Sequence, residues 1–280
     1  MTVESPLVST DWLAGRINAP DVRVADASWY LPQANRDPRA EFAAVHIPRA
    51  VFFDIEDLSD EKNILPHMLA PATKFASRMR KLGLGDGNLI VVYDSAGVYS
   101  SPRAWWMLRA MGHSDVVVLD GGLPKWRSEG RPMEDMSASP FARHFTARKE
   151  HALVKDFVQM KENLLTNAYQ VVDARGVARF KAIEQEPRSG IRSGHIPGSL
   201  NVPYTELTTP AGTLKSRDEL KKVFDAHGVD PFRPTITTCG SGITAAIELL
   251  ALSVAGARDV ALYDGSWAEW GATDAPIETN

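Results

Sequence analysis

The feature that most constrains the fold is an internal repeat, in which the second half of the chain restates the first. Four segments of the first half recur in the second half, in the same order and at nearly constant spacing. The matching pairs are RVADAS (23–28) with VVDARG (171–176), VHIPRAVFFDI (45–55) with GHIPGSLNVPY (194–204), LIVVYDSAG (89–97) with TITTCGSG (235–242), and VVVLDGGLPKW (116–126) with VALYDGSWAEW (260–270). Collinear self-similarity of this kind predicts two copies of one domain.

Each copy alternates short strands with helices. The apolar, valine-rich runs IVVYD, VVVLD and VALYD are typical of buried parallel strands. The segments 72–83 and 216–228 carry apolar residues at helical spacing and end at a glycine, and Ser216 with Glu219 predicts a capping box on the second. This order predicts an α/β fold in each half, a mostly parallel sheet flanked by helices.

The repeat also sets the expected domain boundaries. We predict an N-terminal domain over residues 1–138 and a C-terminal domain over residues 166–280. The segment 139–165 is expected to hold the linker and the start of the second domain, with the boundary near SASPFARHF (137–145). The tail ATDAPIETN (272–280) is expected to be loose.

Composition excludes several classes of function. A net charge of −4 gives no electrostatic footprint for nucleic acid, and no apolar run approaches the length that spans a bilayer. A single cysteine cannot form an internal disulfide, and the start MTVESPLVSTDW lacks the features of a signal peptide. We therefore expect a cytoplasmic protein. With no HExxH, paired CxxC or Walker loop, the sequence indicates neither a metal nor a cofactor.

The only cysteine, Cys239, lies in TTCGSGITAA (237–246), where a strand turns through a glycine-rich loop into a helix. One interpretation is a buried apolar filler, the usual role of an unpaired cysteine. The other is a nucleophile, because the loop N–H groups and the positive helix end converge there and stabilise a thiolate or an anionic adduct. In the first repeat the same position is Asp94, which cannot attack a sulfur donor, so a reactive site is expected only in the second half.

On these residues the chain resembles the rhodanese superfamily over essentially its whole length. In that family two copies of one α/β domain pair up, and only the C-terminal copy has a cysteine that carries a persulfide. CGSGITA resembles the signature of its 3-mercaptopyruvate sulfurtransferases, whereas thiosulfate sulfurtransferases place an Arg–Lys pair where Gly240 and Ser241 stand here. The resemblance implies sulfur transfer from 3-mercaptopyruvate through a Cys239 persulfide to a thiol such as thioredoxin, or to cyanide. The loop residues expected to bind the substrate are Gly240, Gly242, Ile243 and Thr244.

Two arginines are the candidates for holding the carboxylate and keto oxygen of the substrate. The resemblance places these roles on Arg179 and Arg188, and an arginine fork suits a carboxylate because it pairs in bidentate fashion and stays charged. The alternative is that both are surface ion-pair partners of Glu184 and Glu186. Arg192 lies nearby and is expected to have no such role.

The resemblance also implies a proton relay in which Ser241 is backed by a histidine and a carboxylate from the first half. The segment FFDIEDLSDEKNILPHML supplies His67 and, at the carboxylate position, Glu56, where the family pattern has Asp. Asp54 and Asp57 are alternatives for the carboxylate. His67 is equally compatible with a plain loop position before the apolar Met–Leu pair that follows it.

Residues that occur in both repeats are interpreted as structural. His46 and His195 each lie in an HIP turn, and a catalytic histidine has no reason to appear in the copy without a cysteine. Trp126 and Trp270 are likewise expected to pack the domains.

Three rival functions remain open at this point. Thiosulfate is a compact dianion and would favour cations beside the thiolate, so the neutral Gly240–Ser241 pair argues against a thiosulfate sulfurtransferase. A cysteine phosphatase needs an arginine at the end of the loop, where this chain has Thr244 and Ala245. A non-catalytic persulfide carrier or binding module is the third alternative, and it predicts persulfide formation without turnover of a mercapto acid.

Overall fold

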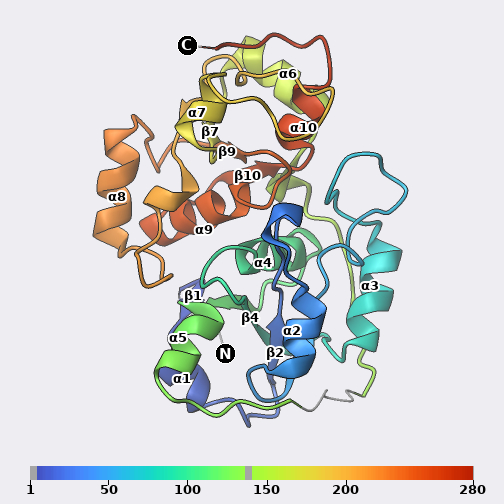
Figure 1. The fold of residues 1–280 in the computed structure, drawn as a ribbon. Coiled ribbons are helices and arrows are strands. Elements are labelled where there is room, and N and C mark those ends of the chain that lie inside the picture. Colours follow the sequence, from blue (N-terminus) through green and yellow to red (C-terminus); the bar gives the residue numbers. More distant parts are fainter. Residues whose placement is uncertain (1–4, 136–140, 280) are drawn as a thin grey trace. The chain divides into compact units, whose positions relative to one another are not determined.

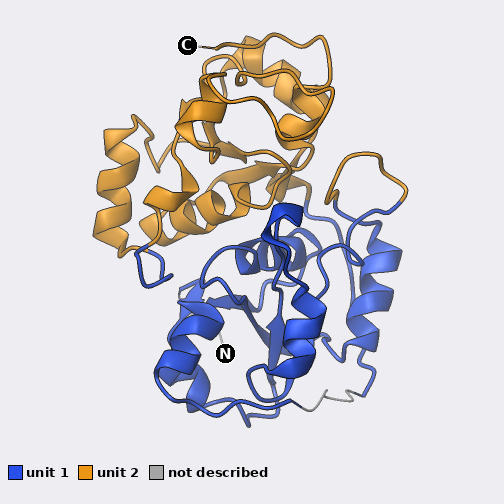
Figure 2. Ribbon diagram, in the orientation of Figure 1, with its two compact units in different colours: residues 1–61, 69–150, 209–214 blue, residues 62–68, 151–208, 215–280 orange. Residues whose placement is uncertain are grey.

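The computed structural model describes residues 5–135 and 141–279, which form two compact units (Figure 2). Unit 1 comprises the residues up to 61 together with 69–150 and 209–214, and unit 2 comprises residues 62–68, 151–208 and those from 215 onward. Thus the segment 62–68 of the first repeat belongs to unit 2. Part of the boundary segment 137–145 lies outside the described residues.

Unit 1 is built on a five-stranded sheet with the order β1-β5-β4-β2-β3, and every pairing in it is parallel (Figure 1). Its strands are β1 (Leu7–Val8), β2 (Val22–Asp26), β3 (Ala50–Phe52), β4 (Leu89–Tyr93) and β5 (Val116–Leu119). Its helices are α1 (Thr10–Ala14), α2 (Pro38–Ala44), α3 (Ala72–Lys81), α4 (Ser101–Ala110), α5 (Gly122–Ser128) and the 3-10 turn η1 (Pro32–Ala34).

Unit 2 repeats this plan with a parallel five-stranded sheet of order β6-β10-β9-β7-β8. Its strands are β6 (Val154–Lys155), β7 (Gln170–Asp173), β8 (Leu200–Asn201), β9 (Thr235–Thr238) and β10 (Val260–Tyr263). Its helices are α6 (Phe157–Thr166), α7 (Val177–Phe180), α8 (Arg217–Ala226), α9 (Ala245–Ala255), α10 (Ser266–Trp270) and the 3-10 turns η2 (His151–Leu153) and η3 (Tyr204–Glu206). Across the described residues, no helix is long and apolar enough to cross a membrane.

The two amphipathic helices form where the sequence predicts them. The capping box of α8 is present, with Ser216 N–H and Oγ–H both donating to Glu219 Oε2 at 2.9 and 2.5 Å. Helices α3 and α8 each end two residues before a glycine with positive φ, Gly83 (φ 66°) and Gly228 (φ 73°). The glycines allow the left-handed turn that ends each helix and redirects the chain into the next strand.

Helix α9, which follows Cys239, is buried on nearly all sides rather than on one face. Its alanine- and leucine-rich sequence favours a helix, and it packs against β9, β10 and α8. Gly256 ends it in the left-handed conformation at φ 109°. Because α9 is held on several sides, the loop before it rests on a rigid base.

The two HIP turns have the same structural role in both units. The His195 ring stacks on Phe180, with centroids 3.7 Å apart, and its Nδ1 lies 2.8 Å from Phe180 O. His46 stacks on Phe42 in the same way, at 4.1 Å, with Nδ1 2.7 Å from Phe42 O. The structure therefore agrees with a packing role for both histidines.

The prediction of a loose C-terminal tail is wrong for the residues that the structure describes. The backbone of Glu278 pairs with that of His195 in both directions, at 2.8 and 3.0 Å, and Trp270 Nε1 donates to Pro276 O at 2.9 Å. In unit 1, Glu134 pairs with His46 in the same antiparallel bridge. The tail is the last element of the repeat, and its backbone hydrogen bonds hold it against the HIP turn.

Candidate functional site

The cysteine loop lies between β9 and α9, at the carboxyl end of a central strand, where ligands bind in open parallel sheets. Cys239 is only 2% exposed. The backbone N–H of Gly242 donates to Cys239 Sγ, with N and S 3.1 Å apart. Gly242 has φ 83°, which a residue with a side chain rarely adopts, and this conformation turns its N–H toward the sulfur.

Helix α10, which follows the neighbouring strand β10, hydrogen-bonds to the backbone of the cysteine loop. Trp267 N–H donates to Cys239 O and Ala268 N–H donates to Gly240 O, both at 2.9 Å. Ser266 Oγ accepts from Cys239 N–H at 3.4 Å and donates to Tyr263 O at 2.8 Å. These contacts fix the backbone of the first two loop residues and so fix where the sulfur points.

The same loop in unit 1 shows what such a turn can hold. Asp94, at the position of Cys239, has its Oδ2 surrounded by the N–H groups of Tyr99, Ser100 and Ser101 at 2.8–3.0 Å. Ser101 Oγ donates to the same oxygen at 2.6 Å. The loop of unit 1 is therefore an anion cradle that its own aspartate fills.

Residue spacing along the two loops indicates which N–H groups of unit 2 correspond to the donors of unit 1. Stepping equally from Asp94 and from Cys239, the three donor N–H groups of unit 1 correspond to those of Thr244, Ala245 and Ala246. These residues lie at the start of α9, where the N–H groups of Thr244 and Ala245 precede the first intrahelical bonds, whereas Ala246 N–H already donates to Ile243 O at 3.2 Å. An anionic second sulfur on Cys239 would meet the cradle that the carboxylate occupies in unit 1.

Both predicted substrate arginines border the cysteine loop. A Cβ placed on Gly240 would lie 3.1 Å from Arg179 Nη2 and 3.8 Å from Arg188 Nη1. Arg179 pairs with Glu186 at 2.5 Å, whereas Arg188 makes no ion pair or hydrogen bond within the described part of the chain. Arg192 donates instead to Ala275 O, at 2.7 Å, and so holds the tail.

A buried ion network behind Arg179 was missed in the sequence. Arg175 is 2% exposed and donates to Asp173 Oδ2 and to Glu186 Oε1, each at 2.7 Å. Burial alone would lower the pKa of Arg175, but Asp173 and Glu186 outweigh it and the pKa is raised. Glu186 thereby becomes a fixed anchor for Arg179. The DAR sequence at the end of β7, with an acid and a base two residues apart, is the sequence signal for this network.

His67 and Ser241 meet inside unit 2. His67 Nδ1 lies 3.0 Å from Ser241 Oγ, and both residues are buried, at 6% and 7% exposure. His67 also has a positive φ of 61°, which is unusual for a residue with a side chain and is often kept at functional positions. The segment 62–68 thus brings a histidine of the first repeat beside the cysteine loop.

Glu56, the carboxylate of the predicted relay, makes one contact within unit 1 that bears on its position. Glu56 Oε1 accepts from Trp29 Nε1–H at 2.8 Å in unit 1. The alternatives are paired with cations, Asp54 with Arg39 at 2.5 Å and Asp57 with Arg78 at 2.8 Å. The step from Glu56 to His67 stays a prediction.

A buried carboxyl that the sequence analysis overlooked lies on α9. Glu248 is fully buried, and neither carboxyl oxygen has a hydrogen-bond partner among the described residues. Burial, and after it the charges of Asp173 and Cys239, raises the pKa of Glu248 well above its usual value. Burial therefore favours the neutral form of Glu248. The sequence of α9 alone does not indicate that this carboxyl is buried.

We expect Glu248→Leu to stabilise the protein by about 1–3 kcal/mol, because it removes an unsatisfied buried polar group. A raised folded-state pKa means that wild-type stability is greatest below the unfolded pKa of about 4.5 and falls as the pH rises above it. The advantage of the variant should therefore widen between pH 5.5 and 8.5 in thermal unfolding. Glu248→Gln is the matched control that keeps the shape without the charge. A difference in stability between wild type and Glu248→Leu that stays constant with pH would show that the pKa of Glu248 is not raised in the folded protein.

Comparison with known proteins identifies the family of this two-domain fold. The model of the rhodanese-like domain matches twice, over residues 9–129 and 156–273. These two matches cover most of the chain, one in each repeat, and the chain belongs to the rhodanese family.

Particular relatives are similar over nearly full length. The chain is 45% identical to the 3-mercaptopyruvate sulfurtransferase of Escherichia coli strain K12, covering 97% of both chains. It is 42% identical to a thiosulfate sulfurtransferase of Gallus gallus, over 94% of this chain and 92% of the relative. A crystal structure of an E. coli enzyme described as a 3-mercaptopyruvate sulfotransferase superimposes with a TM-score of 0.87, at 42% identity, covering 94% of this chain and 99% of that one.

Proposed function

We propose that this protein is a sulfurtransferase that moves sulfur from 3-mercaptopyruvate, through a persulfide on Cys239, to a thiol acceptor, and releases pyruvate. The observation that carries the proposal is the charge distribution around the cysteine. The residues after it, Gly240 and Ser241, are neutral, and the cations Arg179 and Arg188 approach from the side of Gly240.

The choice of donor follows from this distribution. Relatives with different donors in their names lie at 45% and 42% identity, so identity alone does not select one. Thiosulfate carries its charge next to the sulfur that is transferred, and it would be served by cations on the loop itself. 3-Mercaptopyruvate carries its carboxylate beyond the keto carbon, so guanidinium groups displaced from Cys239 match its shape better.

The first half-reaction forms the persulfide. The Cys239 thiolate attacks the sulfur of the donor thiol, a sulfur–sulfur bond forms, and the carbon–sulfur bond breaks with its electron pair passing to carbon. The product on carbon is the enolate of pyruvate, which takes up one proton to become pyruvate. Arg179 and Arg188 hold the carboxylate and keto oxygen, where the negative charge of the enolate develops.

The second half-reaction returns the enzyme to its starting state. A thiolate acceptor attacks the outer sulfur, takes it as its own persulfide, and leaves Cys239 as the thiolate. Thioredoxin or a small thiol fits this role, and cyanide serves in an assay. Neither half-reaction, as proposed, uses a resident metal or cofactor.

The cytoplasmic location expected from the sequence stays a prediction.

Ser241 and His67 are proposed to deliver the proton to the enolate. We expect Ser241→Ala to lower kcat about 100-fold, the scale of a general acid, with less effect on KM. His67→Asn keeps a residue that tolerates positive φ, and it should lower kcat to a similar extent. If the two act as one relay, the double variant should be little worse than either single variant in steady-state pyruvate release. Independent, multiplicative losses would contradict the relay.

The donor is tested by steady-state kinetics with a saturating thiol acceptor. Pyruvate release from 3-mercaptopyruvate is compared with thiosulfate consumption by the same preparation, each expressed as kcat/KM. The proposal predicts a preference for 3-mercaptopyruvate of at least about tenfold, the effect of one charged contact. A preference for thiosulfate would overturn the argument from the neutral loop, and turnover of neither donor would favour a persulfide carrier.

A further inference from the structure

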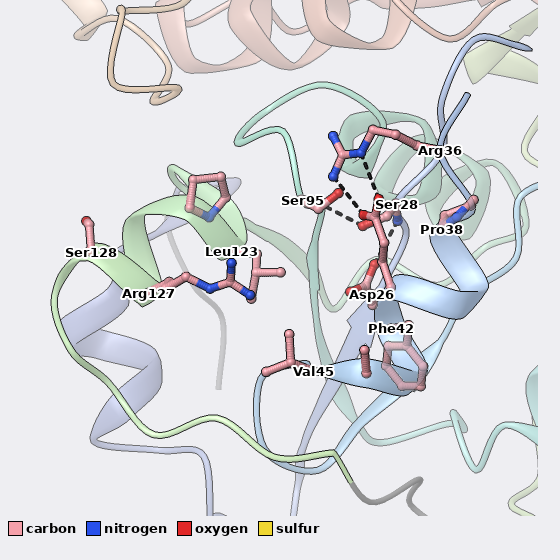
Figure 3. Close-up of a pocket in the computed structure, with 13 residues that line it drawn as sticks. Asp26, Ser28, Arg36, Pro38, Phe42, Val45, Ser95, Leu123, Arg127 and Ser128 are labelled. Atoms are coloured by element: carbon pink, nitrogen blue, oxygen red, sulfur yellow. Dashed lines mark hydrogen bonds and ion pairs between the residues drawn. The ribbon is translucent and has the colours of Figure 1, made fainter. Parts of the chain in front are cut away.

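Unit 1 contains a cavity of about 530 Å³ beside the ends of its central strands (Figure 3). Its walls come from the end of β2, Ser95 in the loop after β4, helices α2 and α5, and the segment before α2. The size suits a small molecule rather than a single ion or water.

The cavity occupies the position in unit 1 that the cysteine site has in unit 2. It is lined by Asp26 and Ser95, whose counterparts in the repeat are Asp173 and Gly240. The nucleophile position next to it is Asp94, whose carboxylate already fills the anion cradle. A ligand here would meet a preformed pocket with no thiol to react with.

One wall of the cavity carries a buried acid. Asp26 is 2% exposed, and its Oδ1 accepts from Ser28 N–H at 2.9 Å. Burial raises the pKa of Asp26 to about 6. Next to it, Glu41 is held on both oxygens, by Arg36 at 2.7 and 2.8 Å and by the Tyr30 hydroxyl at 2.5 Å. Asp26 is thus the lining carboxyl that lacks a cationic partner.

The opposite wall carries a cation. Figure 3 shows Arg127 of α5 across the cavity from Asp26. Within the described residues the guanidinium of Arg127 makes no ion pair or hydrogen bond, in contrast to that of Arg36, which is paired with Glu41. Phe42 and Leu123 add an apolar surface, and both are largely buried. An acid, a cation and an apolar wall around one cavity match the three parts of an amino acid.

We propose that this cavity binds a free α-amino acid without chemical change, with its ammonium group on Asp26, its carboxylate on Arg127 and its side chain against Phe42 and Leu123. The inference does not depend on the sulfur transfer proposed above. It concerns unit 1 alone, so binding can be measured in protein that has lost the reactive thiol.

The test uses full-length Cys239→Ala protein and L-methionine as the probe, with binding followed by calorimetry and by ligand-observed NMR. The controls are 4-(methylthio)butanoate, which lacks the amino group, and 3-(methylthio)propylamine, which lacks the carboxylate. We expect saturable binding of methionine and at least tenfold weaker binding of each control, because each loses one charged contact. No saturable binding of methionine, or equal binding of either control, would overturn the proposal.

Variants of Arg127 and Asp26 then test the two charged contacts proposed for the ligand. Arg127→Gln changes an exposed helix residue and should weaken methionine at least tenfold, whereas Ser128→Ala, its neighbour on the cavity rim, should have little effect. Asp26→Asn should weaken methionine to the same extent at pH 7.5. Unchanged affinity in both Arg127→Gln and Asp26→Asn would reject the assigned site even if methionine binds.

The pH dependence gives an independent readout of the acid. The charged or titratable groups around Asp26 are Tyr93 and Asp94 on the β4 side, and Arg36, Glu41 and Arg127 on the cavity walls. An ammonium ligand needs ionised Asp26, so affinity should fall about tenfold for each pH unit below 6 and level off above it. The Asp26→Asn protein should lose this dependence. Retention of the same profile would show that another group controls binding.

Discussion

Replacing Cys239 with serine should lower kcat/KM for 3-mercaptopyruvate by a factor on the order of 10⁴ or more, because a serine hydroxyl stays protonated and cannot form the sulfur–sulfur bond. The fold should survive, since the equivalent loop of unit 1 holds the oxygens of Asp94 in the same cradle. Pyruvate release at saturating acceptor measures the loss, and thermal unfolding checks the fold.

Ser253→Ala is the matched control for this variant. Ser253 lies on α9, and among residues 5–135 and 141–279 its hydroxyl bonds only to Leu249 O of its own helix, at 2.8 Å. It should retain wild-type turnover. If Cys239→Ser keeps more than a few per cent of the activity while folded, the nucleophile is not Cys239.

The second large effect is expected at the arginines beside the loop. Arg188→Gln should lower kcat/KM for 3-mercaptopyruvate about 10–100-fold, because the carboxylate loses a charged, bidentate partner. Arg179→Gln should cause a similar loss, and Glu186 should stay in place through Arg175. Arg188→Lys should recover only part of the activity, since an ammonium cannot present two parallel N–H groups.

Arg192→Gln is the control that separates binding from stability. Arg192 donates to Ala275 O and so holds the tail rather than the loop. Its replacement should lower the unfolding temperature and leave KM close to the wild-type value. Equal losses of kcat/KM in Arg188→Gln and Arg192→Gln would contradict the assignment of the substrate arginines.

The fold was predictable because duplication repeats its signals. Parallel valine-rich strands, the capping box at Ser216 and the HIP turns each appear where the sequence places them, and both sheets have the same strand order. The tail was misjudged because its residues are polar and lack a helix or strand pattern. Its order comes from backbone pairing of Glu278 with His195, which a composition argument cannot detect.

The candidate site was only partly predictable. The loop, Arg179 and Arg188 were found because they lie in short motifs, and His67 with Ser241 because the resemblance supplied the pairing. Long-range burial gave no local signal. Arg175 looks like a surface residue in the sequence but is buried in an ion network, and Glu248 is a charged type with no partner inside a helix buried on every side.

The repeat also explains how one loop serves two purposes. In unit 1 the carboxylate of Asp94 closes the cradle with N–H donors and a hydroxyl, which stabilises the turn. In unit 2 a cysteine replaces this carboxylate, and the N–H groups of Thr244 and Ala245, at the positions of two donors of unit 1, are placed to meet a charge that forms during the reaction. Cys239→Asp should therefore fold well and be inactive, since it recreates the filled cradle of the first repeat.

The central claim is that sulfur from 3-mercaptopyruvate is held on Cys239. The most direct measurement is a single-turnover experiment with donor and no acceptor, in which pyruvate is quantified and the intact and peptide masses are read from the same sample. The account predicts one pyruvate per chain and a mass heavier by one sulfur atom, located on the Cys239 peptide and removed by a thiol. Pyruvate release without added sulfur, or sulfur on any other peptide, would contradict it.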